Sequence, residues 1–344
     1  MGRILLVILA VAAAALLYLG TGERGLRTDF ALQSAALRHA AVTTLTAGSA
    51  EIPMFLNPGD TIVTPQIRAG LFEPRETQMI LASLRPGDTF VDVGANVGYY
   101  TLLAAQSVGP EGRVVAFEPD PESADLLERN VRLNGFDHVV IERKAVSNAP
   151  GSIRLYLAPE NKGDHRIYDD GERESIEVEA VTLDDYFAEP GGGHRRVDFV
   201  KVDVQGADLA VLEGMSELIE ANDGLLLSIE YWPFGLQGFG DEAKDMLDRL
   251  VAHDFRLFDL RSGETTPEAL LRGYGLQEYV FTNLLTVPGR AEVESLRRRH
   301  AELRAALERE EAEATRAELQ RVTARLRALS PGAPGFPRAT PPAP

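Results

Sequence analysis

The chain has 344 residues, 44 % of them apolar, a formal net charge of −17 and no cysteine. This length suits one large domain with appendages, and the apolar share is enough for a substantial core. The acidic balance argues against nucleic acid as a substrate, because binding phosphates needs a basic face. The lack of cysteine excludes disulfides, a thiolate nucleophile and a cysteine metal site within this sequence.

An unbroken apolar run, Ile4 to Leu19, follows Arg3 near the start of the sequence. We expect residues 1–22 to form an uncleaved transmembrane anchor, because the run with its neutral flanks reaches about 20 residues. A cleaved signal segment is the alternative, and it would place the protein in the periplasm or outside the cell. More arginines follow the run than precede it, which favours an anchored protein with a cytoplasmic catalytic domain.

Residues 23–71 show no regular pattern and are expected to form a cover over the ligand site. IPMFLNP (52–58) and DTIVTPQI (60–67) are interpreted as short extended segments, since prolines interrupt both. A helix is predicted over Pro74 to Leu84, and a turn then leads into an apolar strand.

Two apolar runs, TFVDV and RVVAF, are the most informative part of the sequence. The first, at Thr89, leads into a glycine-bearing turn and the second, at Arg113, leads into an acid. The distance between them fits one helix. This strand–loop–helix–strand order is typical of a doubly wound, Rossmann-like α/β sheet, whose ligand lies at the carboxyl ends of the strands.

The turn itself is GANVG, from Gly94 through Ala95 and Asn96 to Gly98. The two glycines let the backbone turn sharply and approach a ligand closely, since they carry no Cβ. The spacing departs from the dinucleotide fingerprint, because Asn96 occupies the position of the middle glycine.

Acids on both sides of the turn indicate which ligand it holds. Asp92 is expected to point toward the loop, where a carboxylate suits an ammonium group better than a pyrophosphate. Glu118, followed by Pro119, is placed to accept hydrogen bonds from ribose hydroxyls. S-adenosylmethionine (SAM) carries an amino group, a sulfonium and no phosphate. The residues therefore favour SAM over a dinucleotide as the cofactor.

Five segments occur in a characteristic order: FVDVGANVGYYTLLA, VVAFEPDPE, ERNVRLNG, AVTLDDY and VDFVKVDVQGADLAVLEGM. With them the chain resembles the FkbM-type SAM-dependent methyltransferases over about Phe72 to Val287. The resemblance implies a methyltransferase domain at residues 72–288, with a seven-stranded mixed sheet whose last strand is antiparallel. It also implies that Glu73 contacts the amino-acid end of the cofactor; capping of the following helix is the alternative. The family usually has an acid where Gln205 stands.

The elements after the loop are predicted from their patterns. Helices are expected over 99–107 and 121–133, the second capped by Asp120. HVVIERKAV is interpreted as the third strand, with a backbone amide near Ala145 contacting the adenine. SIRLYL and SIEVEAVTL alternate in polarity and predict a hairpin appended to the sheet.

A polar loop, residues 159–174, lies between those two runs and is either functional or only mobile. His165 could be the general base that takes a proton from a substrate hydroxyl; a solvated loop histidine is the alternative. Lys162 and Arg166 could bind an oxygen-rich or anionic acceptor.

The fourth strand, VDFVKVDV, ends at Asp203, which we interpret as a catalytic residue that orients the acceptor. Its alternative role is capping the next helix, predicted over 207–220. Lys201 lies on the same face and could pair with Asp203. Glu230 and Trp232 follow the fifth strand and are expected on the acceptor side, although packing is an alternative for Trp232.

Beyond the domain, residues 289–329 are rich in Ala, Glu, Arg and Leu and predict a long charged helix. Self-association as a coiled coil and a single solvated helix are equally open. Residues 330–344 are proline-rich and are expected to be disordered.

The expected reaction is methyl transfer by direct displacement, without a metal, to a hydroxyl of a sugar, glycan or natural product. The acceptor class comes from kinship rather than from residue chemistry. A catalytically inactive membrane scaffold and a nucleotide-dependent oxidoreductase are the other classes that the sequence leaves open.

Overall fold

The computed structural model describes residues 41–47, 50–169, 171, 173–189, 195–222, 224–276 and 282–288. The chain divides into two units, Met1–Val42 and Thr43–Pro344, and all but two of the described residues belong to the second. The predicted anchor at 1–22, the long helix at 289–329 and the tail at 330–344 lie outside the described residues. Within the described ranges, no helix combines the length and apolar character needed to cross a membrane.

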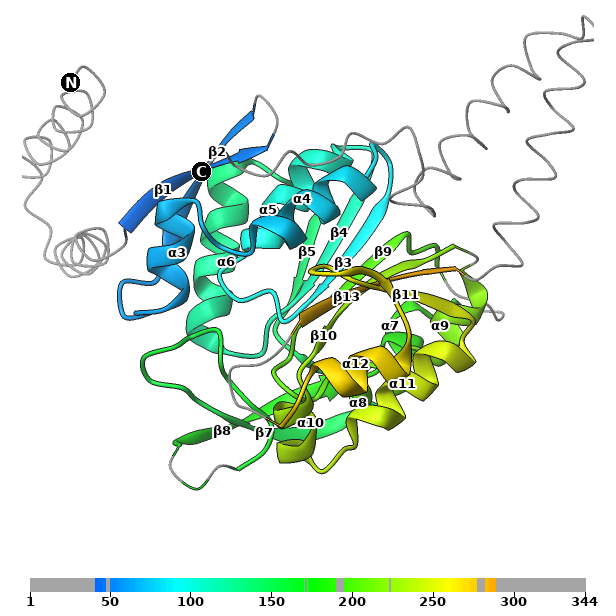
Figure 1. Ribbon diagram of the computed structural model, residues 1–344. Coiled ribbons are helices and arrows are strands. Elements are labelled where there is room, and N and C mark those ends of the chain that lie inside the picture. The colour runs from blue at the N-terminus through cyan, green and yellow to red at the C-terminus, as the bar shows by residue number, and fades with distance from the viewer. Residues whose placement is uncertain are drawn as a thin grey trace, which may run out of the picture. The chain divides into compact units, whose positions relative to one another are not determined.

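The domain is built on an eight-stranded mixed sheet with the order β12-β11-β13-β10-β9-β3-β4-β5 (Figure 1). In chain order its strands are β3 (Thr89–Val93), β4 (Arg113–Phe117), β5 (Val139–Glu142), β9 (Phe199–Val202), β10 (Leu226–Tyr231), β11 (Phe255–Asp259), β12 (Gly263–Thr265) and β13 (Thr282–Pro288).

The pairing confirms a doubly wound α/β fold. β3 is central and runs parallel to both β4 and β9, with Val91 opposite Val115 on one side and Val200 on the other. The last strand, β13, lies antiparallel to β10 and β11, as expected. The prediction of seven strands was one short, because the edge strand β12 adds to β11 through a tight turn.

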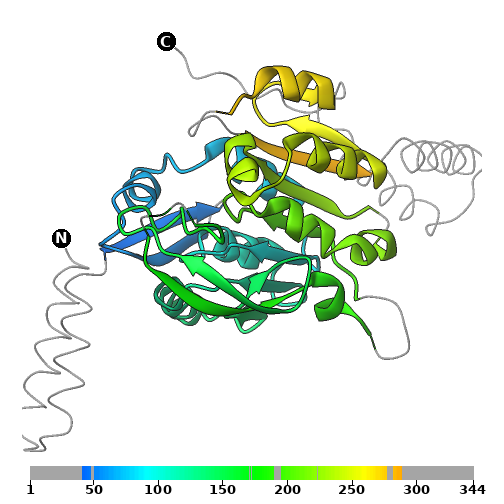
Figure 2. The same ribbon diagram turned by 90° about the horizontal axis from the view of Figure 1, so that it is seen from below.

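Helices cover both faces of the sheet, as Figures 1 and 2 show. Alternate residues of each strand face opposite cores. Phe90 packs with Ile80 and Ala104 in one core, whereas Val91 packs in the other with Leu209 and Leu247. The helices are α4 (Pro74–Ser83) and α5 (Tyr99–Val108) on the first face, and on the second α8 (Asp208–Glu213), α9 (Ser216–Ala221) and α11 (Ala243–Ala252). The remaining ones are α3 (Val63–Ala69), α6 (Pro121–Asn134), α7 (Leu183–Phe187), α10 (Pro233–Phe239) and α12 (Pro267–Gly273).

The predicted helix 207–220 is interrupted and becomes α8 and α9. The break falls at Gly214, where a Cβ atom would lie 2.1 Å from the carbonyl oxygen of Ser147. The neighbouring backbone therefore passes so close that only glycine fits, and the chain turns there. By contrast, α6 matches its prediction: the Asp120 carboxylate accepts the N–H of Ser123, and Gly135 ends the helix at φ 65°.

The segment 60–67, expected to be extended, instead forms α3. The prediction was wrong because it gave weight to Pro65 and overlooked a strong helix start. The Asp60 carboxylate accepts the N–H groups of residues 62, 63 and 64 at 3.0, 3.1 and 2.8 Å. Pro65 is tolerated because it lies in the first turn, where an N–H would have no helical partner.

Replacing Asp60 by alanine is expected to lower the free energy of unfolding by about 0.5–2 kcal/mol, since three N–H groups lose their acceptor. Denaturant unfolding of the purified protein measures this change. Asp137→Ala, an exposed aspartate, serves as the matched control and is expected to unfold like the wild type. Equal midpoints for the two variants would show that Asp60 does not hold α3.

Two small sheets flank the central one. β1 (Ala41–Ala47) and β2 (Ala50–Leu56) form the first, and Asn130 of α6 bonds the Phe55 backbone through its amide. β6 (Ala145–Val146), β8 (Ser175–Val181) and β7 (Gly151–Tyr156) form the second in that order. The predicted hairpin is confirmed as the β7–β8 pair. It does not extend the main sheet, however, because the chain leaves that sheet at Glu142 and β6 pairs with β8.

Candidate active site

The glycine turn after β3 is shaped by the end of β9. Gly94 has φ 84°, and a Cβ there would lie 2.0 Å from the carbonyl oxygen of Asp203. Gly98 has φ 94°, and its Cβ would meet Leu127 of α6 at 2.5 Å. Neither position accepts a side chain without movement of the neighbouring chain. The loop is thus held against both the β9 end and α6.

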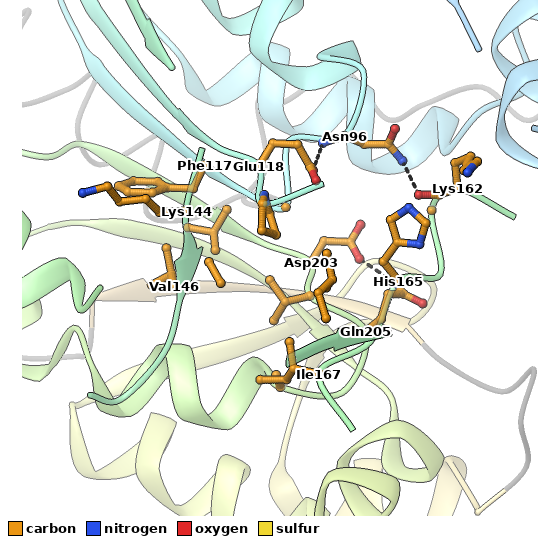
Figure 3. Close-up of a pocket in the computed structure, with 18 residues that line it drawn as sticks. Asn96, Phe117, Glu118, Lys144, Val146, Lys162, His165, Ile167, Asp203 and Gln205 are labelled. Atoms are coloured by element: carbon orange, nitrogen blue, oxygen red, sulfur yellow. Dashed lines mark hydrogen bonds between the residues drawn. The ribbon is translucent and has the colours of Figure 1, made fainter. Parts of the chain in front are cut away.

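Glu118, at the end of β4, is held by two backbone N–H groups. Its Oε2 accepts from the Asn96 N–H at 2.7 Å (Figure 3). Its Oε1 accepts from the Asp120 N–H at 2.8 Å. Each oxygen keeps a further lone pair for a ligand. The side chain is buried, and burial is the main cause that raises the pKa of Glu118 to about 8. The carboxyl group is therefore a fixed pair of acceptors at the mouth of the turn.

A pocket opens beside Glu118 and brings together most of the predicted cofactor residues. Its wall includes Gly94, Asn96, Glu118, Pro119 and Ala145. Its apolar side comes from the second small sheet and the loop after it, through Val146, Leu155 and Ile167. The Glu118 oxygens at one end of the pocket can accept hydrogen bonds from ribose hydroxyls, and the apolar slot at the other end suits an adenine ring. The pocket therefore has the chemistry that an adenosyl group needs. Ala95 lines the neighbouring cleft instead, and Gly98 acts through the turn alone.

Asp92 supports the loop from beneath. It is buried, and its Oδ2 accepts the hydroxyl of Thr101 at 2.6 Å, while its Oδ1 has no hydrogen-bond partner among the described residues. Burial raises the pKa of this carboxyl group, although the charge of Lys201 opposes the shift. The side chain is not part of the pocket wall.

A second, larger cleft of about 890 Å³ adjoins the pocket. Aromatic side chains of Phe72, Tyr99, Tyr100 and Trp232 contribute to its walls. The two cavities share five lining residues: Gly94, Asn96, Gly163, Asp203 and Gln205. Asp203 therefore stands where a group could pass from one cavity to the other.

Both carboxylate oxygens of Asp203 accept a hydrogen bond from a neighbouring side chain. Oδ2 accepts from the Lys201 ammonium at 2.9 Å, and Oδ1 accepts from the Gln205 amide at 2.8 Å. The predicted pair with Lys201 is thus confirmed. Asp203 is not a helix cap, because Asp208 accepts the N–H groups of residues 204 and 206 at this helix start. The Asp203 side chain is 22 % exposed, whereas Lys201 is 2 % exposed.

Lys201 is surrounded by acids. Burial acts to lower its pKa, but the charges of Asp203, Glu76, Glu73 and Asp92 outweigh burial and raise it. Its Nζ also lies 4.7 Å from the centroid of the Tyr100 ring. The surrounding acids therefore favour the charged form of the ammonium.

Two acids of α4 complete this cluster. Glu73 accepts the Tyr100 hydroxyl at 2.8 Å and lines the acceptor side of the cleft, with no bond that caps the helix. Burial first, and then the charge of Glu76, raise the pKa of Glu73 to about 8. Glu76 is buried and accepts from Ser228 at 2.8 Å and from Asn283. Sequence reasoning missed Glu76, since an acid in the first turn of a helix is ordinary.

The loop after β7 crosses the pocket as a cover. The carbonyl oxygen of Lys162 accepts from the Asn96 side chain at 3.1 Å, and that of Glu160 accepts from the Thr61 N–H at 2.8 Å. The Lys162 ammonium pairs with Glu122 of α6 at 3.1 Å. Its charge is thus directed toward α6, and Lys162 lines the pocket beside Glu118 and not the larger cleft.

His165 faces the cofactor pocket and not the acceptor cleft. Its Nδ1 accepts the N–H of Ala158 at 2.9 Å, and its Nε2 lies 3.6 Å from Oδ2 of Asp120. Burial raises the pKa of Asp120, but the nearby His165 ring and the hydrogen bond from the Ser123 N–H outweigh burial and lower it to about 2. Both ring nitrogens are directed at the protein, so this arrangement favours a role in holding the loop over that of a general base.

Arg166 and Trp232 form a packed layer under the same loop. The guanidinium lies 5.1 Å from the Trp232 ring centroid and bonds both carboxylate oxygens of Asp164, at 2.8 and 3.0 Å. Both side chains are buried, and both line the larger cleft, so packing and acceptor contact stay open for Trp232. Glu230 is also buried but reaches the cleft, where Gln205 donates to it at 3.2 Å.

The raised pKa of Glu118 predicts that adenosyl binding depends on pH. Ribose hydroxyls bind the carboxylate better than the neutral acid, so affinity should rise as Glu118 loses its proton near pH 8. Titration with methylthioadenosine, which lacks the ionisable amino-acid end of SAM, is expected to show roughly tenfold tighter binding at pH 9 than at pH 6. Glu118→Gln is the control, with weak binding that does not change with pH. A flat wild-type profile would contradict the assignment.

Comparison with known proteins agrees with this geometry. Residues 92–257 match the family model of the methyltransferase FkbM domain. This segment is an FkbM methyltransferase domain. Its cofactor is SAM, and the fixed acceptors of Glu118 and the adjoining apolar slot fit an adenosyl group. Among the described residues, no group of three or more histidines and acids is arranged to hold a metal ion.

Three relatives illustrate the similarity. Methyltransferase sdnD of Sordaria araneosa is 30 % identical over 40 % of this chain and 64 % of its own. Methyltransferase 1 of Beauveria bassiana is 27 % identical over 55 % of this chain and 73 % of its own. Hexuronic acid methyltransferase AglP of Haloferax volcanii is 27 % identical over 44 % of this chain and 60 % of its own. The match therefore spans less than two thirds of the Sordaria and Haloferax proteins.

Proposed function

We propose that the protein transfers a methyl group from SAM to a hydroxyl of a sugar, a glycan or a related natural product. The observation that supports this most is the position of Asp203, which lines both the adenosyl pocket and the larger cleft. A carboxylate at that junction can take the proton of an acceptor hydroxyl as it reacts.

The residues divide the work between binding and proton transfer. Bound SAM supplies an activated methyl group. Glu118 holds the ribose and the slot at Val146 holds the adenine. The acceptor oxygen forms a bond to the methyl carbon as the carbon–sulfur bond breaks, and that electron pair goes to sulfur. Asp203 receives the hydroxyl proton. Alignment of the two reactants can supply on the order of 7–11 kcal/mol.

The junction of the two cavities favours a neutral hydroxyl over a carboxylate as the acceptor. The cleft as a whole carries both signs of charge, since its lining includes Glu73, Asp203 and Glu230 as well as Arg75, Arg173 and Arg261, but the cation beside Asp203, Lys201, is already paired with it. An acceptor carboxylate would meet the Asp203 carboxylate at the reacting position. Aromatic walls suit the apolar face of a sugar ring. The name of the Haloferax relative, a hexuronic acid methyltransferase, supports a sugar-bearing acceptor.

Transfer of tritiated methyl from SAM to a panel of phenyl glycosides, neutral and uronic, tests the proposal. We expect labelled methyl ethers, which survive mild base, with neutral glycosides as acceptors. Labelled products that mild base hydrolyses would be methyl esters. They would show that the acceptor group is a carboxylate and would contradict the proposed hydroxyl acceptor. SAM binding with no transfer to glycosides or to glycan and lipid extracts would favour the inactive scaffold.

Membrane attachment is proposed on the sequence alone. The run Ile4–Leu19 suits an anchor, and the arginines after it suit a cytoplasmic catalytic domain. Fractionation of cells that express the full chain, beside a chain without residues 1–22, measures it. We expect the full chain in the membrane fraction, resistant to high salt, and the shortened chain in the soluble fraction.

A further inference from the structure

Gln205 joins the two acids nearest the junction of the cavities. Its Nε2 donates to Asp203 at 2.8 Å and to Glu230 at 3.2 Å, so both amide hydrogens are used. The amide nitrogen is assigned to the end that faces the two acids, where it donates to both. The backbone of Gln205 has φ 55°, a conformation that few residues other than glycine adopt. Figure 3 shows Gln205 beside Asp203 at the pocket wall.

This pair of acids sits within a dense set of charges. Burial, followed by the charges of Asp203 and Asp208, raises the pKa of Glu230 well above its usual value. The ionisable groups that act on Asp203 and Glu230 come from α4, β3, β9 and α8, namely Glu73, Glu76, Asp92, Lys201 and Asp208. Only one of these is a cation. A further carboxyl group at position 205 would therefore join a cluster of acids that already has a single cation.

We infer that Gln205 is a positioning residue that holds Asp203 and Glu230 side by side without adding a charge, and so sets the charge beside the sulfonium of SAM. The inference rests on the proposed function, because it takes SAM as the occupant of the pocket. Gln205 and Asp203 line both cavities. The methyl group passes from one cavity to the other, so the sulfonium that carries it lies beside these side chains.

The relative affinity for SAM and S-adenosylhomocysteine (SAH) measures this charge. SAM is a sulfonium cation and SAH is a neutral thioether, while their other groups are the same. A single charge within 4–6 Å of the sulfur changes the preference by roughly tenfold or more. Titrations that both ligands share, including that of Glu118, cancel in the ratio Kd(SAH)/Kd(SAM).

Calorimetry of both ligands from pH 6 to pH 9 tests the inference. The wild type is expected to prefer SAM, with a ratio that changes by less than about threefold over this range. Gln205→Glu creates three neighbouring carboxyl groups that share a proton and release it as the pH rises. Its ratio is therefore expected to increase about tenfold between pH 6 and pH 9.

Two variants separate charge from structure. Gln205→Glu combined with Glu230→Gln restores two acids and one amide, and its ratio is expected to become flat again. Gln205→Met removes both hydrogen bonds without adding charge; its ratio is expected to be lower than that of the wild type and flat. A flat ratio in Gln205→Glu, or no recovery in the exchanged pair, would overturn the inference. A wild type that binds neither ligand would instead refute the proposed function itself.

Discussion

Replacing Asp203 by asparagine is expected to slow methyl transfer by about 10²–10⁴-fold, because the variant loses the group that takes the hydroxyl proton. Asparagine has the same shape, and its carbonyl oxygen can still accept from Lys201, so the site should keep its form. The rate of tritium transfer to the best acceptor of the panel, at saturating SAM, measures the loss. SAM affinity is expected to change by no more than roughly tenfold, the effect of one charge.

Asp137→Asn is the matched control for this rate, since Asp137 is exposed and lies after α6, away from both cavities. Its rate should equal that of the wild type. If Asp203→Asn kept more than a tenth of the wild-type rate, a group other than Asp203 would take the hydroxyl proton. The rate of Glu73→Gln would then be the next to measure, because Glu73 lines the same cleft.

Replacing Lys201 by methionine is expected to lower the free energy of unfolding by about 3–5 kcal/mol at pH 8, because it leaves buried carboxylates without their cation. Asp203 loses the partner at 2.9 Å, and Glu73, Glu76 and Asp92 lose the nearest positive charge. Urea unfolding of the purified protein at several pH values measures the change.

The size of this loss should depend on pH. In the wild type the pKa of Lys201 is raised, so its stabilising effect is fully present below the unfolded value of about 10.4 and is constant between pH 5 and pH 8. In the variant, the pKa values of Glu73 and Glu76 are higher in the folded state than in the unfolded chain. As the pH rises, the unfolded chain therefore releases these protons first. The variant therefore loses stability as the pH rises, and the deficit is smaller at pH 5 than at pH 8.

Lys244→Met is the control, because Lys244 is exposed and pairs with Asp248 one turn away on α11. It should unfold like the wild type at both pH values. If Lys201→Met lowered the free energy of unfolding only slightly, and by the same amount at pH 5 and pH 8, the prediction would be contradicted. Such a result would show that the surrounding acids are neutral in the folded protein even when Lys201 is absent.

Local patterns predicted the parts of the site that one segment builds alone. The turn from Gly94 to Gly98, the acid at Glu118 and the cap at Asp120 each follow from a short run of residues with one physical role. The pairing of Lys201 with Asp203 followed from the pleat of a single strand. The antiparallel direction of the last strand came from the family resemblance.

Features that depend on distant contacts were missed or misplaced. Glu76 becomes part of the site only because α4 packs against Ser228 and Asn283, which lie far along the chain. His165 looked like a free base, yet the fold turns its ring toward Ala158 and Asp120. The start of α3 depends on the side chain of Asp60. The prediction overlooked it, because it treated Pro65 as a sign of an extended segment. Tertiary packing decided the cases of Glu76 and His165, whereas α3 depends on a local cap that lies within its own segment.

The most direct test of the central claim is calorimetric titration of the wild type and Glu118→Ala with SAM and with NAD. The wild type should bind SAM and not NAD. Glu118→Ala should bind SAM about 10²-fold or more weakly, because two hydrogen bonds to a charged acceptor are lost. Binding of NAD in preference to SAM, or equal SAM affinity in the two proteins, would contradict the assignment of this pocket to an adenosyl donor held by Glu118.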